Sequence, residues 1–158
     1  MAFQYGAAEP SLEFAFKVEA ELDPPLELGE MAGLRKRIIP IKGGKVSGPK
    51  LNGIVVPGGA DWQTLRPNNV ADIYARYTLR SEDGVLITVE NPGIRHGPEE
   101  VMKKLIAGER VDPSTYYFRT TPRLEAPAGV YAWMGESVWV CQGVRWPDSV
   151  EIRFYAVL

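Results

Sequence analysis

Two arginines lie within runs of strand-forming residues, where a charged side chain is unusual. Arg76 is flanked by Tyr-Ala and Tyr-Thr, and Arg119 by Tyr-Tyr-Phe and Thr-Thr. Arginine is almost never buried without a partner, and its planar guanidinium binds a carboxylate or an enolate oxygen through paired N–H donors. If one face of each strand lines a cavity, we expect Arg76 and Arg119 to clamp an anion there. The alternative is that both face solvent or form structural ion pairs, for which the candidates are Asp61, Asp72 and Glu125.

Three side chains are candidates for proton transfer, namely Asp61, His96 and Glu125. His96 is the single histidine of the chain, and the ordinary pKa of histidine lies close to neutrality. Burial in an apolar cavity would raise the pKa of either carboxyl group, which would let that group act as an acid or base at neutral pH. The alternatives are that His96 is a surface residue and that Asp61, which follows a glycine-rich turn, caps the next turn.

Aromatic residues close to these positions are candidates for the walls of the same cavity. They are Trp62, Tyr116, Tyr117 and Trp133. Large aromatic side chains are also ordinary core residues, so packing in the core is the alternative for each of them. Cys141 lies in an apolar run and is expected to be buried and unreactive.

The chain lacks the standard motifs of metal, nucleotide and acyl-transfer chemistry. One histidine and one cysteine are too few for a Cys/His zinc site. The Gly-rich sequence of residues 43–48 lacks the GxxxxGK[ST] pattern of a phosphate-binding loop, and no GxSxG elbow is present. Any chemistry is therefore expected to proceed without a cofactor or metal.

The elements that position these residues are mostly strands, because apolar and polar residues alternate along much of the chain. The longest such runs are residues 12–22 and 150–156, and Asp83-Gly84 predicts a hairpin turn. The residues expected on the buried faces of the two terminal strands are Phe14, Phe16, Ile152 and Phe154. Further strands are expected over residues 36–42, 51–56, 73–80, 85–90, 116–121, 129–133 and 137–142.

Residues 43–62 are unusually rich in glycine for a strand-forming region. Glycine costs backbone entropy on folding, so its density indicates sharp turns or a close approach of two backbones. We therefore expect Gly58 or Gly59 to have a positive φ or to pack against a neighbouring strand.

One helix is expected over residues 98–107, which begin with Pro98, carry two glutamates in the first turn and end before Gly108. Eight to ten short strands with one helix predict an all-β fold, an antiparallel calycin-like barrel. The expected organisation is a flexible arm over residues 1–10 and a single barrel domain over residues 11–158.

Composition limits the classes of partner. The formal net charge is −2, which argues against nucleic acid. No apolar run reaches the roughly 18 residues of a membrane span, and the N-terminus lacks the pattern of a signal peptide. We therefore expect a cytoplasmic protein whose partner is a small-molecule ligand or substrate, and the sequence leaves a homo-oligomer open.

Five segments together resemble one known family. They are GGKVSGPKLNG, VVPGGADW, ARYTLRSEDG, YYFRTTPRLEAP and VYAWMGESVWVCQG, in this order. They resemble the family catalogued as domain of unknown function 3237, from about Leu12 to the C-terminus. The resemblance implies a small antiparallel barrel of the calycin kind, with a small-molecule cavity and one covering helix. The positions that match the family's motifs are Gly48, Pro49, Gly58, Gly59, Asp61, Trp62, Arg76, Tyr77, Tyr116, Tyr117, Phe118 and Arg119.

Two functions follow from these residues. The first is a cofactor-independent lyase, isomerase or cyclase acting on a small oxygenated or phenolic compound. Asp61, Glu125 or His96 would move the proton, while arginine and tyrosine donors would stabilise the developing oxyanion. The alternative is a barrel that binds a small organic acid without catalysis, for which apolar walls and one arginine suffice.

Overall fold

The computed structural model describes residues 8–158, and ten antiparallel strands account for most of them. The arm expected over residues 1–10 therefore falls largely outside the described residues. The strands are β1 (Leu12–Leu22), β2 (Leu26–Met31), β3 (Leu34–Ser47), β4 (Gly53–Leu65), β5 (Ala71–Ser81), β6 (Leu86–His96), β7 (Tyr117–Thr120), β8 (Arg123–Glu125), β9 (Val138–Arg145) and β10 (Ser149–Val157).

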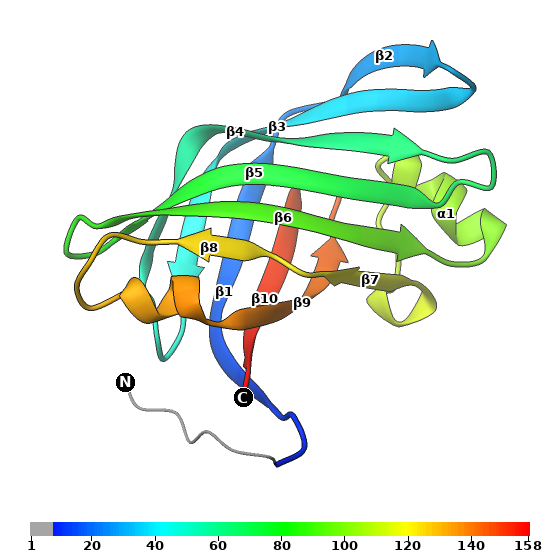
Figure 1. Cartoon of the computed structure of the whole chain (residues 1–158). Coiled ribbons are helices and arrows are strands. Elements are labelled where there is room, and N and C mark those ends of the chain that lie inside the picture. The colour runs from blue at the N-terminus through cyan, green and yellow to red at the C-terminus, as the bar shows by residue number, and fades with distance from the viewer. Residues whose placement is uncertain (1–7) are drawn as a thin grey trace.

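Eight of the strands close into a barrel, as the sequence predicts (Figure 1). The hydrogen-bonded order is β1-β10-β9-β7-β6-β5-β4-β3, and pairing between β1 and β3 closes it. Strand β8 adds to β6, and β2 forms a hairpin with β3 that extends past the barrel wall. Closure leaves the eight wall strands with one face toward a shared interior, which brings residues distant in sequence together.

Short helices cover parts of the barrel. The helix α1 (Glu99–Ile106) follows β6 and lies at the barrel end where β6 finishes (Figure 1), and its own residues Met102 and Leu105 are buried. Two short 3-10 helices are η1 (Pro113–Thr115) and η2 (Ala132–Glu136). In the described part of the chain, no helix has the length and apolar character needed to cross a membrane.

The barrel end opposite α1 is filled by a packed aromatic core. Trp139 is 1% exposed, and its ring lies 5.8 Å from that of Phe16 and 6.2 Å from that of Phe154, between centroids. Phe16 and Phe154 stack on each other with centroids 4.5 Å apart. The other end of the interior is only partly filled, and the polar residues described below gather there.

Two expectations for local structure are wrong. Phe14 lies on the outer face, where its ring contacts that of Tyr155, because a bulge between Phe14 and Phe16 changes the alternation and places Ala15 in the core. Residues 129–133 form no strand, and the 3-10 helix η2 begins at Ala132 instead. The expected burial of Phe16, Ile152 and Phe154 is confirmed.

The expectation for the glycine pair is confirmed. Gly58 has a φ of +115°, and a Cβ at Gly59 would lie 2.6 Å from the carbonyl oxygen of Arg76 and 2.6 Å from Cβ of Tyr77. The register of β4 against β5 shifts between Val56 and Ala60. The glycines therefore let β4 bulge while it stays close to β5.

Replacing Gly59 with alanine is expected to lower the free energy of unfolding by about 1–3 kcal/mol, because backbone must move to make room for the methyl group. Gly135 is the matched control, since a Cβ there would lie 3.4 Å from its nearest neighbour, the carbonyl oxygen of Leu124. Urea denaturation of Gly59→Ala and Gly135→Ala measures the difference. Equal losses in the two variants would contradict the steric account.

Candidate functional site

A cavity of about 50 Å³ lies inside the barrel on the side of α1. All eight wall strands contribute to its lining, most of it apolar, with residues such as Ala20, Ile41, Ile73 and Ile152. A minority of polar side chains faces the same space. The polar lining residues are Asp61, Gln63, Tyr77, Asn91, Arg95, Thr120 and Arg145.

Three guanidinium groups are buried at this end of the barrel. Arg37 and Arg95 are each 1% exposed and Arg145 is 6% exposed. Each side chain lies on the inward face of a different strand, β3, β6 and β9. Burial of several like charges so close together is unfavourable unless anions compensate them.

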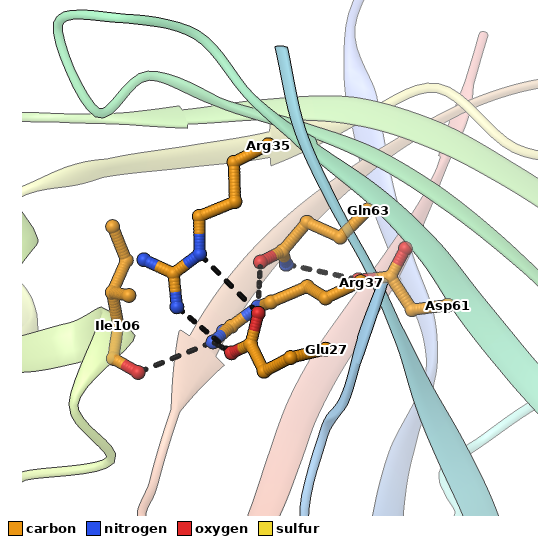
Figure 2. A network of polar contacts seen from close by, with 6 residues as sticks. All are labelled: Glu27, Arg35, Arg37, Asp61, Gln63 and Ile106. Carbon is orange, nitrogen blue, oxygen red and sulfur yellow. Dashed lines mark hydrogen bonds and ion pairs between the residues drawn. The ribbon is translucent and has the colours of Figure 1, made fainter. Parts of the chain in front are cut away.

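Arg37 is held by protein groups (Figure 2). Its Nε donates a hydrogen bond of 2.8 Å to Oε1 of Gln63, and its Nη1 donates one of 3.2 Å to the carbonyl oxygen of Ile106 at the end of α1. Nη1 also lies 3.6 Å from a carboxylate oxygen of Glu27 on β2. Glu27 in turn forms a paired hydrogen bond with Arg35. Arg37 thus ties the β2–β3 hairpin and α1 to the barrel wall.

Asp61 is the carboxylate of the cavity wall. Its Oδ1 accepts a hydrogen bond of 2.9 Å from the amide of Tyr74, and its Oδ2 accepts one of 3.1 Å from Nε2 of Gln63. Burial raises the pKa of Asp61 above its ordinary value, although the Tyr74 amide, the charge of Arg95 and the Gln63 amide oppose the shift. A raised pKa makes the carboxylate a stronger base, which suits acid–base chemistry.

Arg95 is packed against an aromatic ring and lies close to the other two buried arginines. Its guanidinium is 5.6 Å from the ring centroid of Phe118, opposite it on β7. Burial, followed by repulsion from Arg145 and Arg37, lowers the pKa of Arg95 to about 10, so the group stays positively charged at neutral pH. Burial likewise lowers the pKa of Arg145, whose Nη1 donates to the carbonyl oxygens of Trp146, Pro147 and Ser149.

Six buried side-chain atoms have no hydrogen-bond partner among residues 8–158, and all belong to residues that line this cavity. The Asn91 amide lies beside the Tyr77 hydroxyl without reaching ordinary hydrogen-bond geometry, and burial strongly raises the pKa of Tyr77. Buried polar atoms are nearly always satisfied in proteins, so this concentration indicates a place for a ligand or ordered water. The atoms are Tyr77 Oη, Asn91 Oδ1, Arg95 Nε, Arg95 Nη2, Thr120 Oγ1 and Arg145 Nε.

The expected convergence of Arg76 and Arg119 in the cavity is wrong, because both side chains are exposed on the outer surface. Each is one residue away from an inward side chain, Tyr77 on β5 and Phe118 on β7, and neighbouring residues of a strand face opposite sides. Arg119 lies over the Tyr117 ring at 5.5 Å and donates to the carbonyl oxygen of Phe118.

The other predicted site residues divide between the two barrel ends and the surface. Exposed His96 stacks on exposed Tyr117, with ring centroids 4.9 Å apart. Trp62 shares an outer hollow beside the Gly58 bulge with Arg76. Glu125 is exposed on β8, and half-buried Trp133 packs on Trp139 at the opposite end. Their catalytic or binding roles stay predictions, and none of these side chains lines the interior cavity.

Two of the predicted residues do lie at the α1 end. Asp61 lines the cavity directly. Tyr116 is half-buried against the core, and its hydroxyl accepts a hydrogen bond of 3.0 Å from the Arg145 amide at the cavity rim. The sequence therefore pointed to one wall residue and one rim residue of the cavity.

The arginines that do face the interior were missed by the sequence analysis. Arg37 alternates in phase with Ile39 and Ile41, which was a usable signal for an inward side chain. Arg95 lies beyond the end of the strand predicted over residues 85–90, whereas β6 continues to His96. Arg145 was likewise placed after the end of the expected strand, although β9 reaches it.

The arrangement suits binding and polarising an anion more than holding a metal. Within residues 8–158, no group of three or more His, Cys, Asp or Glu side chains is placed to hold a metal ion. The interior offers positive charge, hydroxyl donors and one carboxylate in apolar surroundings. Such groups can stabilise an enolate or carboxylate and shift one proton.

Comparison with known proteins gives the same fold. A family model described as protein of unknown function (DUF3237) matches residues 10–157. The crystal structure of a conserved protein of unknown function from Rhodopseudomonas palustris is 39% identical, with a TM-score of 0.92 over 96% of this chain and 100% of that one. A protein from Acinetobacter baumannii described as β-barrel like is 36% identical, with a TM-score of 0.84 over 98% and 100% of the two chains.

A more distant structure has the same fold. It is described as an enzyme from Penicillium herquei and is 16% identical, with a TM-score of 0.71 over 99% of this chain and 100% of that one. At this identity the likeness concerns the fold alone.

Proposed function

The chain belongs to the family of proteins of unknown function DUF3237, and we propose that it is a cofactor-independent enzyme that moves a proton on a small oxygenated compound in the barrel cavity. The observation that carries the proposal is the group of unpartnered polar atoms around this cavity, together with Asp61. Reactions of this kind include isomerisation, cyclisation and elimination next to a carbonyl group.

Asp61 supplies the acid or base in this proposal. Its carboxylate lies in a largely apolar wall, and burial raises its pKa above the ordinary value, which makes it a stronger base. The hydrogen bonds from the Tyr74 amide and Gln63 fix its orientation.

Arg95 and Tyr77 supply the electrostatic stabilisation. Arg95 keeps its charge in a site of low dielectric, where a positive group interacts strongly with an anionic substrate. The Tyr77 hydroxyl stays protonated because burial raises its pKa, so the hydroxyl remains a hydrogen-bond donor. Both groups are in place before a substrate binds, which avoids reorganisation during the reaction.

Tyr77→Phe is expected to lower turnover by about 10²–10³, the usual effect of removing one oxyanion donor. The variant should fold at least as stably as the wild type, because it removes a buried hydroxyl without a partner. The assay is proton NMR of hydrogen–deuterium exchange next to the carbonyl of levulinate and of cyclohexanone in deuterated water. Tyr74→Phe is the control, since the Tyr74 hydroxyl lies on the outer face and bonds to Glu90. Wild-type exchange no faster than in buffer would overturn the proposal.

A barrel that only binds a small organic acid is the second candidate function. The observation that favours it is that Asp61 already satisfies a backbone amide and the Gln63 side chain, so its role can be structural. A binding barrel would retain the ligand and show no accelerated exchange for either probe.

A further inference from the structure

We propose that the cavity takes a short monocarboxylate carrying a hydroxyl or enol oxygen, with the carboxylate on Arg95 and the second oxygen between Tyr77 and Asn91. The inference rests on the proposed function of the same cavity and names its substrate class.

One edge of the Arg95 guanidinium has no hydrogen-bond partner and can bind a carboxylate. Its unpartnered atoms are Nε and Nη2, and the N–H groups of these two nitrogens point the same way from one edge of the guanidinium plane. This edge matches the two oxygens of a carboxylate and forms two parallel charge-assisted hydrogen bonds. No protein carboxylate in the described chain is hydrogen-bonded to this edge.

The charge balance at this end of the barrel also calls for an anion. Three buried guanidiniums, together with Arg35 at the rim, face three carboxylates: Asp61 in the wall, Glu27 shared between Arg35 and Arg37, and Asp148 near Arg145. Burial and then repulsion from Arg145 and Arg37 lower the pKa of Arg95, and a single bound carboxylate would offset that repulsion.

The second group of free atoms lies deeper in the barrel. Asn91 precedes Arg95 by four residues on β6, so its side chain lies on the same inward face and further from α1. Between them, Gly93 pairs with Thr120, and a Cβ at Gly93 would lie 2.4 Å from Thr120 Cγ2. Because Gly93 has no side chain, Thr120 occupies the space between the side chains of Arg95 and Asn91.

The chemistry of these deeper atoms selects a hydroxyl or enol group. Asn91 Oδ1 is an acceptor without a donor, so it requires an O–H or N–H from the ligand. The Tyr77 and Thr120 hydroxyls can donate to the oxygen of that same group. A ligand hydroxyl, or the enol of an oxo acid, satisfies both requirements at once, whereas an unsubstituted alkyl chain satisfies neither.

Size and access restrict the ligand further. A cavity of about 50 Å³ holds only a few groups the size of water, each of which needs about 10–15 Å³ on the same measure. An outer groove between Pro24-Pro25 and the end of α1 shares Leu22 and Arg145 with the cavity. A short ligand entering along this groove would meet the arginines with its carboxylate, while its second oxygen reaches the deeper atoms.

Calorimetric or NMR titration of the full chain with β-hydroxybutyrate tests the inference. Arg95→Met and Arg95→Lys are each expected to weaken its binding by about tenfold to a hundredfold, because lysine keeps the charge but lacks the planar fork. Arg80→Met is the control, because Arg80 is exposed on the outer face of β5 and the substitution removes the same charge. Circular dichroism establishes that each variant is folded.

Three further probes separate the parts of the inference. β-Hydroxybutyramide lacks the charge and butyrate lacks the hydroxyl, so both should bind at least tenfold more weakly than β-hydroxybutyrate. Inorganic phosphate should also bind more weakly, since it lacks a second group for Asn91. Equal binding of the amide, tighter binding of phosphate, or unchanged affinity in Arg95→Met would overturn the assignment.

The outcomes also distinguish this inference from the proposed function. Accelerated exchange of cyclohexanone without any carboxylate binding would leave the enzyme proposal standing and overturn the carboxylate site. Arg95-dependent binding of β-hydroxybutyrate without exchange of levulinate or cyclohexanone would support the carboxylate site and favour the binding barrel.

Discussion

Asp61→Asn is expected to lower turnover by about 10²–10⁴, the usual contribution of a positioned acid or base. Asparagine keeps the size of the side chain and can still accept the hydrogen bond from the Tyr74 amide. It cannot take up a proton from a substrate carbon, so the chemical step loses its acceptor while the cavity keeps its shape. The measurement is the rate of hydrogen–deuterium exchange of levulinate.

The pH dependence gives this prediction a second readout. If Asp61 acts as a base, the wild-type rate should rise with pH through the raised pKa of Asp61 and then level off. The residual rate of Asp61→Asn should lack that step. Asp72→Asn is the matched control, since Asp72 is tied to Arg66 on the surface through hydrogen bonds of 2.6 and 2.8 Å.

The pH dependence of the unfolding free energy should also report on Asp61, and its direction follows from the raised pKa. Because folding raises the pKa of Asp61, its contribution to stability is fully present below the ordinary value of about 3.9 and is lost as pH rises through the raised value. The unfolding free energy of Asp61→Asn relative to wild type should therefore increase with pH across this range. Normal turnover in a folded Asp61→Asn protein would instead assign Asp61 to a purely structural role.

Trp139→Ala should be the most destabilising substitution considered, with a loss of about 3–5 kcal/mol in unfolding free energy. The indole is 1% exposed and packs on the rings of Phe16, Phe154 and Trp133. Its Nε1 also donates a hydrogen bond of 2.9 Å to the carbonyl oxygen of Met134, which would lose this partner. Urea denaturation at constant pH measures the loss.

Trp146→Ala provides the comparison for the same chemical change. Trp146 is only partly buried, and its ring stacks under the Arg110 guanidinium at 4.5 Å. An exposed contact of this type contributes about 0.5–1 kcal/mol, so the loss should be several times smaller than for Trp139. Similar losses in the two variants would contradict the assignment of the packed core to the end opposite the cavity.

The two ends of the barrel differ in packing and polarity. The aromatic end carries dense packing, in which Phe16, Trp139 and Phe154 are essentially inaccessible. The α1 end carries unpartnered polar atoms and like charges, which reduce stability unless a ligand is bound. A ligand that binds only the folded state should raise the unfolding free energy, and this gain should depend on Arg95.

The sequence by itself determined most of the wall strands, the helix near residues 98–107 and the closed barrel class, because alternation and helix-end residues are local signals. It did not predict β2 or β8, and the strand that it predicted over residues 129–133 does not form. It also contained the correct orientation of Arg76, which is out of phase with Ile73, Tyr77 and Leu79. Arginine within a strand run is therefore not by itself a sign of burial, because alternation places Arg76 on the outer face.

Only the tertiary structure decided which inward residues meet. Asp61, Arg95 and Arg145 come from strands far apart in the chain, and their proximity depends on barrel closure and on the register of every intervening pair of strands. The bulges at Phe14–Phe16 and Val56–Ala60 shift that register. The continuation of β6 through Pro92 to Arg95 depends on pairing with β5 and β7, a long-range interaction that no local pattern encodes.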